Sequence, residues 1–130
     1  MLSFATRRLA EVPDVTAPDG SEVWILAASQ RGSMAYFRLP AGAVSRPVVH
    51  RGVEELWFFL GGRGLFWRRS ASDEGTVAVA AGISISIPAG TAFQFRATGE
   101  APLDAVAVTM PPWPGPEEAE PAEGIWAATV

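Results

Sequence analysis

Short apolar or alternating runs, separated by turn residues, follow one another along most of the chain. Each run is bounded by Gly, Pro, Ser, Asp or Glu, which is the pattern of β-strands joined by tight turns. No window keeps apolar residues at three- and four-residue spacing for more than about two turns, so helices are not expected. The runs predict nine strands, at residues 22–28, 33–39, 44–50, 54–60, 65–69, 76–80, 83–87, 92–97 and 103–110.

This succession of short strands predicts an all-β domain, either a sandwich or a barrel. The chain of 130 residues is the size of one domain, and its hydrophobic fraction of 48% suffices for one core. A domain this small must close or cover its sheet edges. We therefore expect a jelly-roll barrel, also called a double-stranded β-helix, over residues 21–110. Residues 1–20 contain turn residues at Pro13-Asp14 and at 17–20 and are expected to form a loosely packed N-terminal arm or one short edge strand.

The last twenty residues, 111–130, differ in composition from the rest. Prolines cannot donate regularly to a strand ladder, so we expect this Pro-rich and Glu-rich tail to lie extended on the barrel, pinned by Trp113 and Trp126. Four of the acidic residues also fall here, which leaves the remainder of the chain close to neutral. The prolines of the tail are Pro111, Pro112, Pro114, Pro116 and Pro121, and the acidic residues are Glu117, Glu118, Glu120 and Glu123.

Composition excludes several classes of function. The chain has no cysteine and all ten of its basic residues are arginine, which removes disulfides, thiol chemistry and Schiff-base catalysis by lysine. A net charge of −4, with no basic stripe, argues against nucleic-acid binding. No apolar run is long enough to cross a bilayer, and the first residues do not resemble a secretory signal, so we expect a cytoplasmic protein with no membrane contact.

One stretch, residues 50–64, gathers most of the candidate chemistry. It holds the only histidine, His50, together with Glu54 and Glu55, of which Glu54 is expected to face solvent. Because strand side chains alternate, Glu55, Trp57 and Phe59 should share one face of the strand and Leu56, Phe58 and Leu60 the other. The glycine-rich residues 61–64 predict a hairpin rather than a phosphate-binding loop, since neither a helix nor a Lys-Ser or Lys-Thr step follows.

Residues 50–62 resemble the first motif of the cupin superfamily, in which two histidines two apart are followed by a glutamate and, after six residues, a glycine. Glu55 and Gly62 have that last spacing. Residues 82–93 resemble the second cupin motif, a glycine, five residues, Pro-x-Gly and then a histidine. Gly82 begins that match, and Phe93 stands at the histidine position. The resemblance covers about residues 44–97 and the flanking strands, and it implies a small single-domain cupin barrel.

The resemblance also implies a site inside the barrel, where cupins typically hold a divalent metal with three histidines and one glutamate. Glu55 keeps the carboxylate and His50 fills one histidine position. Val48 or Gly52 occupies the other, depending on which of the two histidines His50 matches, and Phe93 occupies the third. Because a divalent metal needs about three protein ligands, we expect neither a tightly bound metal nor another cofactor.

Two interpretations stay open for each candidate site residue. His50 and Glu55 form either a polar pair that orients a ligand or exchanges a proton, or simply a buried hydrogen bond. Four aromatic residues form either a ligand pocket, with a tyrosine hydroxyl, or part of the packed core. These residues are Tyr36, Trp57, Phe93 and Phe95.

The leading interpretation is a protein that binds a small organic molecule inside the barrel, with His50 and Glu55 as polar anchors and the four aromatic residues around the ligand. The alternatives are an enzyme, either a metal-dependent oxygenase or isomerase or a metal-free acid–base catalyst, and a structural or interaction protein. We also expect a homodimer, because Leu56, Phe58 and Leu60 need a cover on the outside of the barrel. The tail, through Trp113 and Trp126, is the competing cover.

Overall fold

The computed structural model describes residues 3–130, so the first two residues of the expected arm lie outside the described part. The chain is almost entirely strand and turn, which confirms the all-β prediction. The part described contains no helix that is long and apolar enough to span a membrane. The elements in order are β1 (Val15–Thr16), β2 (Glu22–Ala28), β3 (Ser33–Leu39), β4 (Val48–His50), β5 (Glu54–Gly61), β6 (Arg63–Arg69), β7 (Glu74–Ala80), β8 (Ser84–Ile87), β9 (Ala92–Ala97), β10 (Leu103–Met110), the 3₁₀ turn η1 (Pro116–Glu118) and β11 (Ala119–Pro121).

All nine predicted strands are present. The two-residue β1 is the short edge strand that was one of the alternatives for residues 1–20, and β11 is additional. The strand expected at residues 44–50 is shorter than predicted. Val44 makes only an isolated bridge to Arg96, and the ladder begins at Val48. Pro47, which has no N–H to donate, separates the two parts.

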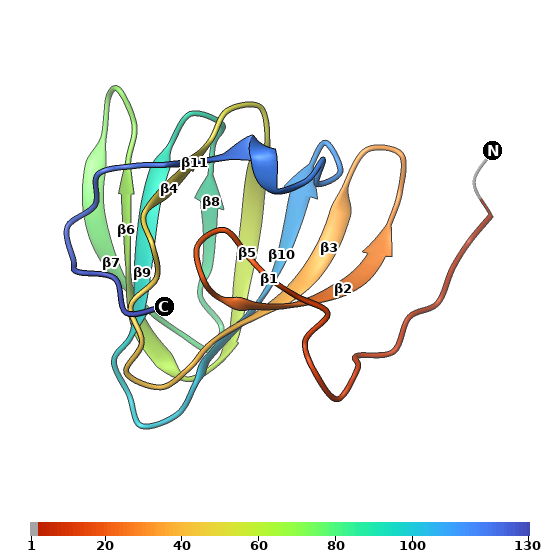
Figure 1. Cartoon of the computed structure of the whole chain (residues 1–130), viewed down its shortest axis with the longest axis horizontal. Coiled ribbons are helices and arrows are strands. Elements are labelled where there is room, and N and C mark those ends of the chain that lie inside the picture. Colours follow the sequence, from red (N-terminus) through yellow and green to blue (C-terminus); the bar gives the residue numbers. More distant parts are fainter. Residues whose placement is uncertain (1–2) are drawn as a thin grey trace.

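The strands form two antiparallel sheets that pack against each other (Figure 1). Sheet A has the order β1-β2-β3-β10-β5-β8, and sheet B has the order β11-β4-β9-β6-β7. One core cluster joins the inner faces of both sheets, with Trp57 and Phe59 from sheet A and Phe66, Phe93 and Phe95 from sheet B. This is the expected jelly-roll arrangement.

Strand β5 alternates between the two sides of sheet A as predicted. Glu55, Trp57 and Phe59 point into the barrel and are buried. Leu56, Phe58 and Leu60 point outwards, with 51%, 44% and 48% of their surface exposed.

The prediction of a hairpin at residues 61–64 is wrong. Strand β5 pairs with β8 and β10 in sheet A, whereas β6 pairs with β7 and β9 in sheet B, so this glycine-rich turn carries the chain from one sheet to the other. Gly62 has a φ of 77°, and a Cβ at this position would overlap with the carbonyl oxygen of Pro102. The glycines therefore allow a tight crossing, which local sequence does not distinguish from a hairpin.

The tail packs along sheet B. Its strand β11 pairs antiparallel with β4, with Ala119 opposite His50, so the tail does contribute a short ladder before Pro121 ends it. Farther on, Gln94 of β9 bonds with the backbone of Ile125 and Trp126. The tail therefore lies on a different sheet from the outward side chains of β5, and the idea that it covers them is wrong.

Candidate functional site

The two polar residues singled out in the sequence meet at one end of the barrel. His50 is the last residue of β4 and Glu55 the second residue of β5, so the two sheets place them on facing strands. Only 6% of His50 and 3% of Glu55 is exposed. The imidazole Nε2 lies 3.0 Å from the carboxylate Oε2. The sequence prediction that these residues lie together is confirmed.

A row of polar side chains continues from Glu55 across sheet A. Thr109 of β10 is the register partner of both Glu55 and Ser33. The hydroxyl oxygens of Ser33 and Thr109 are 2.5 Å apart, and Ser33 Oγ accepts a hydrogen bond from the backbone N–H of Trp113 at 2.9 Å. These bonds tie the first part of the tail to this end of the barrel.

Two aromatic rings enclose the imidazole. The ring centroid of Phe93 is 5.3 Å from that of His50 on the inner side. The indole of Trp113 meets the imidazole edge to face, with centroids 5.1 Å apart and planes at 84°. Trp113 was expected only to pin the tail, and no local pattern links residue 113 to residue 50. Together the rings account for much of the burial of His50.

Within residues 3–130, four buried side-chain polar atoms have no hydrogen-bond partner, and three of them belong to residues that point into the barrel. These three are Nδ1 of His50, Oε2 of Glu55 and Nε1 of Trp57, and the fourth is Nε of Arg96. Oε2 is within ion-pair distance of His50, but the contact lacks the alignment of a hydrogen bond. Glu55 and Trp57 are two residues apart on the inner face of β5, so these atoms lie on the same side of the strand.

Most of the expected aromatic pocket is packed core. The rings of Phe66 and Phe95 stack with centroids 5.2 Å apart, and Trp57 meets Phe95 edge to face at 5.3 Å. Trp57 also stacks on Phe37 at 4.9 Å. Of the residues singled out in the sequence, Phe93 touches His50, while Trp57 and Phe95 lie deeper in this cluster.

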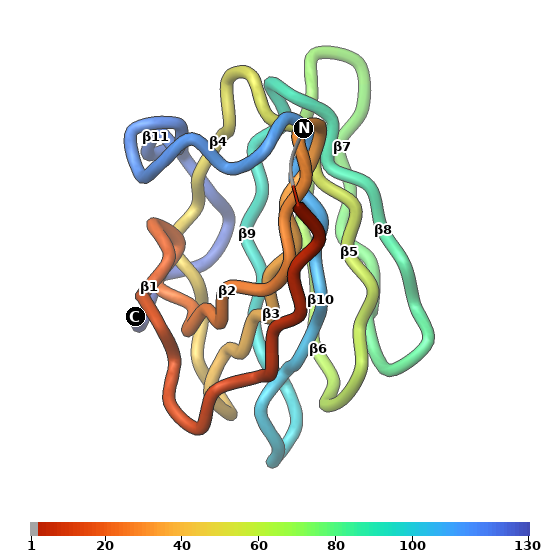
Figure 2. The backbone as a smooth tube through the Cα atoms, turned by 90° about the vertical axis from the view of Figure 1, so that its right-hand side faces the viewer, coloured from red at the N-terminus to blue at the C-terminus, as the bar shows by residue number. Residues whose placement is uncertain are grey.

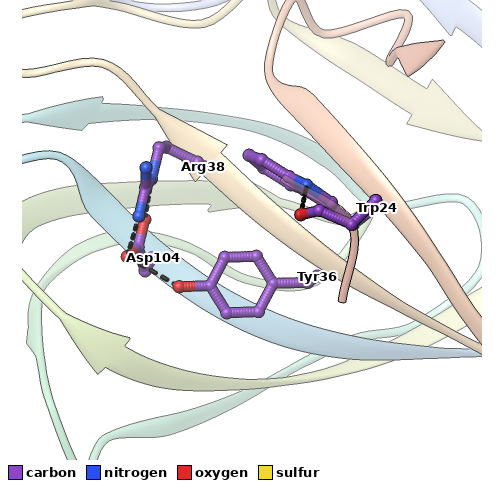
Figure 3. A network of polar contacts seen from close by, with 5 residues as sticks. Trp24, Tyr36, Arg38 and Asp104 are labelled. Carbon is purple, nitrogen blue, oxygen red and sulfur yellow. Dashed lines mark hydrogen bonds and ion pairs between the residues drawn. The ribbon is translucent and has the colours of Figure 1, made fainter. Parts of the chain in front are cut away.

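The expectation that Tyr36 lines the barrel is wrong. Register places it opposite Val106 on the outer face of sheet A, because Phe37 takes the inward position. Its hydroxyl donates to Asp104 Oδ2 at 2.7 Å, and Arg38 forms an ion pair with the same carboxylate (Figure 3). Partial burial and the bond to Asp104 raise the pKa of Tyr36, and the bond to Asp104 raises that of Arg38. This network is separate from the site.

A further buried acid lies within the electrostatic field of the pair. The carboxylate of Asp19 accepts hydrogen bonds from the backbone N–H and the hydroxyl of Ser21, at 2.9 and 2.6 Å. Burial raises the pKa of Asp19, the bonds from Ser21 lower it, and the charges of Glu55 and His50 act in opposite directions. In the sequence, Asp19 is marked only as a turn residue between Pro18 and Gly20.

The metal that the cupin resemblance implies lacks its ligands here. Val48, one of the two candidates for a missing histidine position, and Phe93, at the third, face each other as register partners across β4 and β9, and both are buried. Gly52, the other candidate, has no side chain to donate. Within residues 3–130, no three His, Cys, Asp or Glu side chains lie close enough together to hold a metal ion. The donor set of His50 and Glu55 therefore does not fit a tightly held divalent metal.

A surface hollow of about 490 Å³ lies at the same end of the barrel. It is lined by residues that are neighbours of the site in sequence, such as Gly52 beyond His50, Glu54 beside Glu55, and Met110 and Pro111 before Trp113. Gln30 and Arg31, in the turn between β2 and β3, also line it.

Solved structures with similar folds belong to several proteins. BH2720 of Bacillus halodurans is 23% identical with a TM-score of 0.63, covering 68% of this chain and 69% of its own. A double-stranded β-helix protein of Klebsiella pneumoniae is 14% identical with a TM-score of 0.64, covering 80% and 85%. The oxalate decarboxylase of Lactobacillus farciminis, solved as a formate complex, is 25% identical with a TM-score of 0.62, covering 68% of this chain but 28% of its own.

The sequence itself gives a more direct assignment. No curated protein sequence matches the chain. The family model described as the Cupin domain matches residues 35–109, more than half of the chain, and this segment includes both motifs and the His50–Glu55 pair. The chain therefore belongs to the cupin family.

Proposed function

We propose that this cupin domain binds a small polar organic molecule at the His50–Glu55 end of its barrel. The observation that carries the proposal is the set of three buried polar atoms without partners, on His50, Glu55 and Trp57. Buried nitrogen and oxygen atoms are almost always hydrogen-bonded in native proteins, and leaving one unpaired costs about 1–3 kcal/mol. A ligand that pairs with these atoms relieves that cost.

The chemistry of the three atoms limits the ligand class. Trp57 Nε1 can only donate, an ionised Glu55 can only accept, and His50 Nδ1 can do either. A small group with both capacities, such as a carboxylic acid or a primary amide, matches them. The stacked core below Phe93 favours a ligand of few atoms. Formate, which the Lactobacillus farciminis oxalate decarboxylase holds in its crystal structure, can as an anion only accept, so it probes the donors of Trp57 and His50, whereas acetamide has both capacities.

A ligand would enter the barrel through the surface hollow beside Gly52 and Met110. The indole of Trp113, in the first part of the tail, lies against the imidazole of His50. The tail segment around Trp113 is held to the barrel by one backbone bond to Ser33. Displacement of this segment would expose the imidazole on the side that Trp113 covers.

The proposal is tested by calorimetric titration of formate, acetate and acetamide into the wild-type protein. At least one of these probes is expected to bind, and His50→Phe and Glu55→Gln are expected to weaken that binding at least about tenfold, because each removes a polar partner. Tyr36→Phe is the matched control, since it removes a hydroxyl on the outer face of the same sheet. Binding that survives in both site variants, or no binding of any probe, contradicts the proposal.

Acid–base catalysis is a second candidate function, favoured by the 3.0 Å contact between His50 Nε2 and Glu55 Oε2. A carboxylate in contact with one imidazole nitrogen leaves the other free to exchange a proton with a bound molecule. Proton NMR of each bound probe, followed over hours, separates the functions. Chemical change that is lost in His50→Gln supports an enzyme, and unchanged probe spectra support a binding protein.

A further inference from the structure

Strands β7 and β8 lie on the same margin of the barrel and form the edges of the two sheets (Figure 2). Within residues 3–130, β7 pairs only with β6 of sheet B and β8 only with β5 of sheet A, so no ladder joins these two edges. A hollow of about 310 Å³ lies at this seam, and we call it the seam hollow. Residues of β6, β7 and β8 and of the turns that follow β6 and β8 line it. A volume of this size accommodates a small metabolite.

The seam hollow is separate from the hollow of about 490 Å³ that leads towards the His50–Glu55 pair. The turn between β8 and β9 contributes to both, with Pro88 and Thr91 in the lining of the seam hollow and Ala89 in that of the other. Neither His50 nor Glu55 lines the seam hollow. A molecule bound there would therefore use a different set of side chains from a molecule inside the barrel.

A guanidinium forms one wall of the seam hollow. Arg68 lies two residues after the core residue Phe66 on β6, so its side chain starts on the inner face of sheet B. Its Nη1 donates to the backbone carbonyl oxygen of Ser86 on β8, at 2.9 Å, and this bond bridges the two sheets. Within residues 3–130 this is the only hydrogen bond of the guanidinium, which carries five N–H donors. The remaining donors can hold a ligand, and their planar arrangement matches a carboxylate.

A carboxylate of opposite charge lines the same hollow. Asp73 stands in the turn between β6 and β7, two residues before Gly75, which is the register partner of Arg68. The hydrogen bonds of this turn join Ser70 to the backbone of Asp73 and leave its carboxylate unused. Within residues 3–130, Arg68 and Asp73 form an ion pair neither with each other nor with a third residue. The seam hollow therefore presents two opposite charges that do not neutralise each other directly.

The rest of the lining provides space and neutral polar groups. Gly75 places no side chain beside Arg68, and a Cβ at this position would meet no atom within 4 Å apart from its chain neighbours. Thr76 and Thr91 add hydroxyl groups, each of which can donate or accept. A small molecule can therefore lie beside the guanidinium and bond with uncharged groups as well as with the two charges.

We propose that the seam hollow binds a small zwitterion of the free amino-acid class, with its carboxylate on Arg68 and its ammonium group on Asp73. A simple anion would be repelled by Asp73 and a simple cation by Arg68, whereas a zwitterion is attracted by both. Asp73 is exposed and Arg68 partly exposed, so each ion pair contributes little, and we expect a dissociation constant on the order of 10 mM. This site is independent of the site proposed inside the barrel.

Amide NMR titrations with glycine, β-alanine and γ-aminobutyrate test the proposal, at low salt because salt screens exposed charges. At least one probe is expected to shift the amides of Arg68, Gly75 and Thr91. Acetate and methylammonium, which carry one charge each, are expected to bind there about fivefold more weakly, the effect of one exposed ion pair. Arg68→Gln and Asp73→Asn should weaken binding of the zwitterion by the same factor. Arg69→Gln is the matched control, because that guanidinium donates to the Glu123 carbonyl oxygen in the tail, at 3.2 Å.

Gly75→Val is a second test that keeps both charges. Its side chain enters open space, so the fold should be retained while the hollow is filled and binding is lost. Asp73→Asn is unlike Arg68→Gln in removing no hydrogen bond of the folded chain, so it decides the result if Arg68→Gln misfolds. The proposal is overturned if no zwitterion shifts these amides, if a singly charged probe binds as tightly, or if Asp73→Asn has no effect. Shifts confined to His50 and Trp57 would report the barrel site and would also overturn the seam site.

Discussion

Replacing Gln94 with methionine should loosen the C-terminal tail from sheet B. Gln94 is completely buried on the outer face of β9. Its Nε2 donates to the carbonyl oxygens of Ser45 and Trp126, both at 2.8 Å, and its Oε1 accepts from the N–H groups of Ile125 and Trp126, at 3.0 and 3.1 Å. One side chain therefore satisfies four backbone groups, three of which belong to the tail.

The loss of stability in Gln94→Met follows from the loss of these four hydrogen bonds. A buried hydrogen bond contributes about 1 kcal/mol net, and each backbone group left unpaired in the interior costs about 1–3 kcal/mol. Methionine conserves the length and volume of glutamine, so a cavity adds little. Water reaches part of the tail, which limits the loss to about 3 kcal/mol. For a domain of this size that corresponds to a fall in Tm of about 10 °C.

Urea denaturation gives the global loss, and hydrogen exchange shows where it arises. Exchange at the amides of Ile125 and Trp126 should accelerate most in Gln94→Met, because Gln94 Oε1 accepts from both. Thr129→Val is the control in the same tail. It removes the side-chain oxygen that accepts from the Val44 N–H at 2.8 Å, and the free energy of unfolding should fall by about 1 kcal/mol or less. A Gln94→Met protein that loses no more than this control, with unchanged exchange at residues 125 and 126, would refute the reasoning.

Two other substitutions test the interior. Burial raises the pKa of Asp19, so the folded protein keeps that proton to higher pH than the unfolded chain, and stability falls as pH rises through the folded pKa. Asp19→Asn should therefore stabilise the protein at neutral pH, with a gain in urea denaturation that disappears below the ordinary pKa of aspartate. Phe93→His, 5.3 Å from the His50 ring, adds a third donor and should increase zinc affinity in calorimetry, whereas no gain contradicts the placement of Phe93 at the metal position.

Strand positions and the alternation of β5 were predictable because both depend on nearest neighbours in the sequence. Trp57 and Phe59 are two residues apart, so they share a face whatever sheet the strand joins. Which face would be inside was not predictable from apolar character, since Leu56, Phe58 and Leu60 are as apolar as the buried set. The motif resemblance, which places Glu55 in the barrel, supplied that information.

Tyr36 shows why the site was only partly predictable. It lies between Ala35 and Phe37 in a strand that has no polar alternation to mark its inner face. Phe37 is inside, stacked on Trp57, and this forces Tyr36 outwards. The register of β3 with β10 determines which of its side chains point inwards, and register is a property of the whole sheet.

Trp113 and the glycine turn were missed for a related reason. The contact between Trp113 and His50 joins residues that are far apart in the sequence, and it exists only after the tail has docked on Ser33. The turn at Gly62 joins strands that pair with different partners, although each strand alone reads like half of a hairpin. Local sequence patterns indicate the individual strands, whereas the pairing partners of each strand depend on the assembled sheets.

The proposed ligand site in the barrel and the apolar side chains that are expected to pair two copies lie on opposite sides of one strand. Glu55 and Trp57 point from β5 into the barrel, and Leu56 and Phe58 point from the same strand to the outside. Because the side-chain period of a strand is two, a substitution such as Phe58→Arg changes the outer face and leaves the inner residues in place. Ligand binding that persists in a monomeric Phe58→Arg protein would show that the site is complete in one chain. Loss of binding in a folded monomer would instead show that the second copy holds the barrel end in its binding conformation.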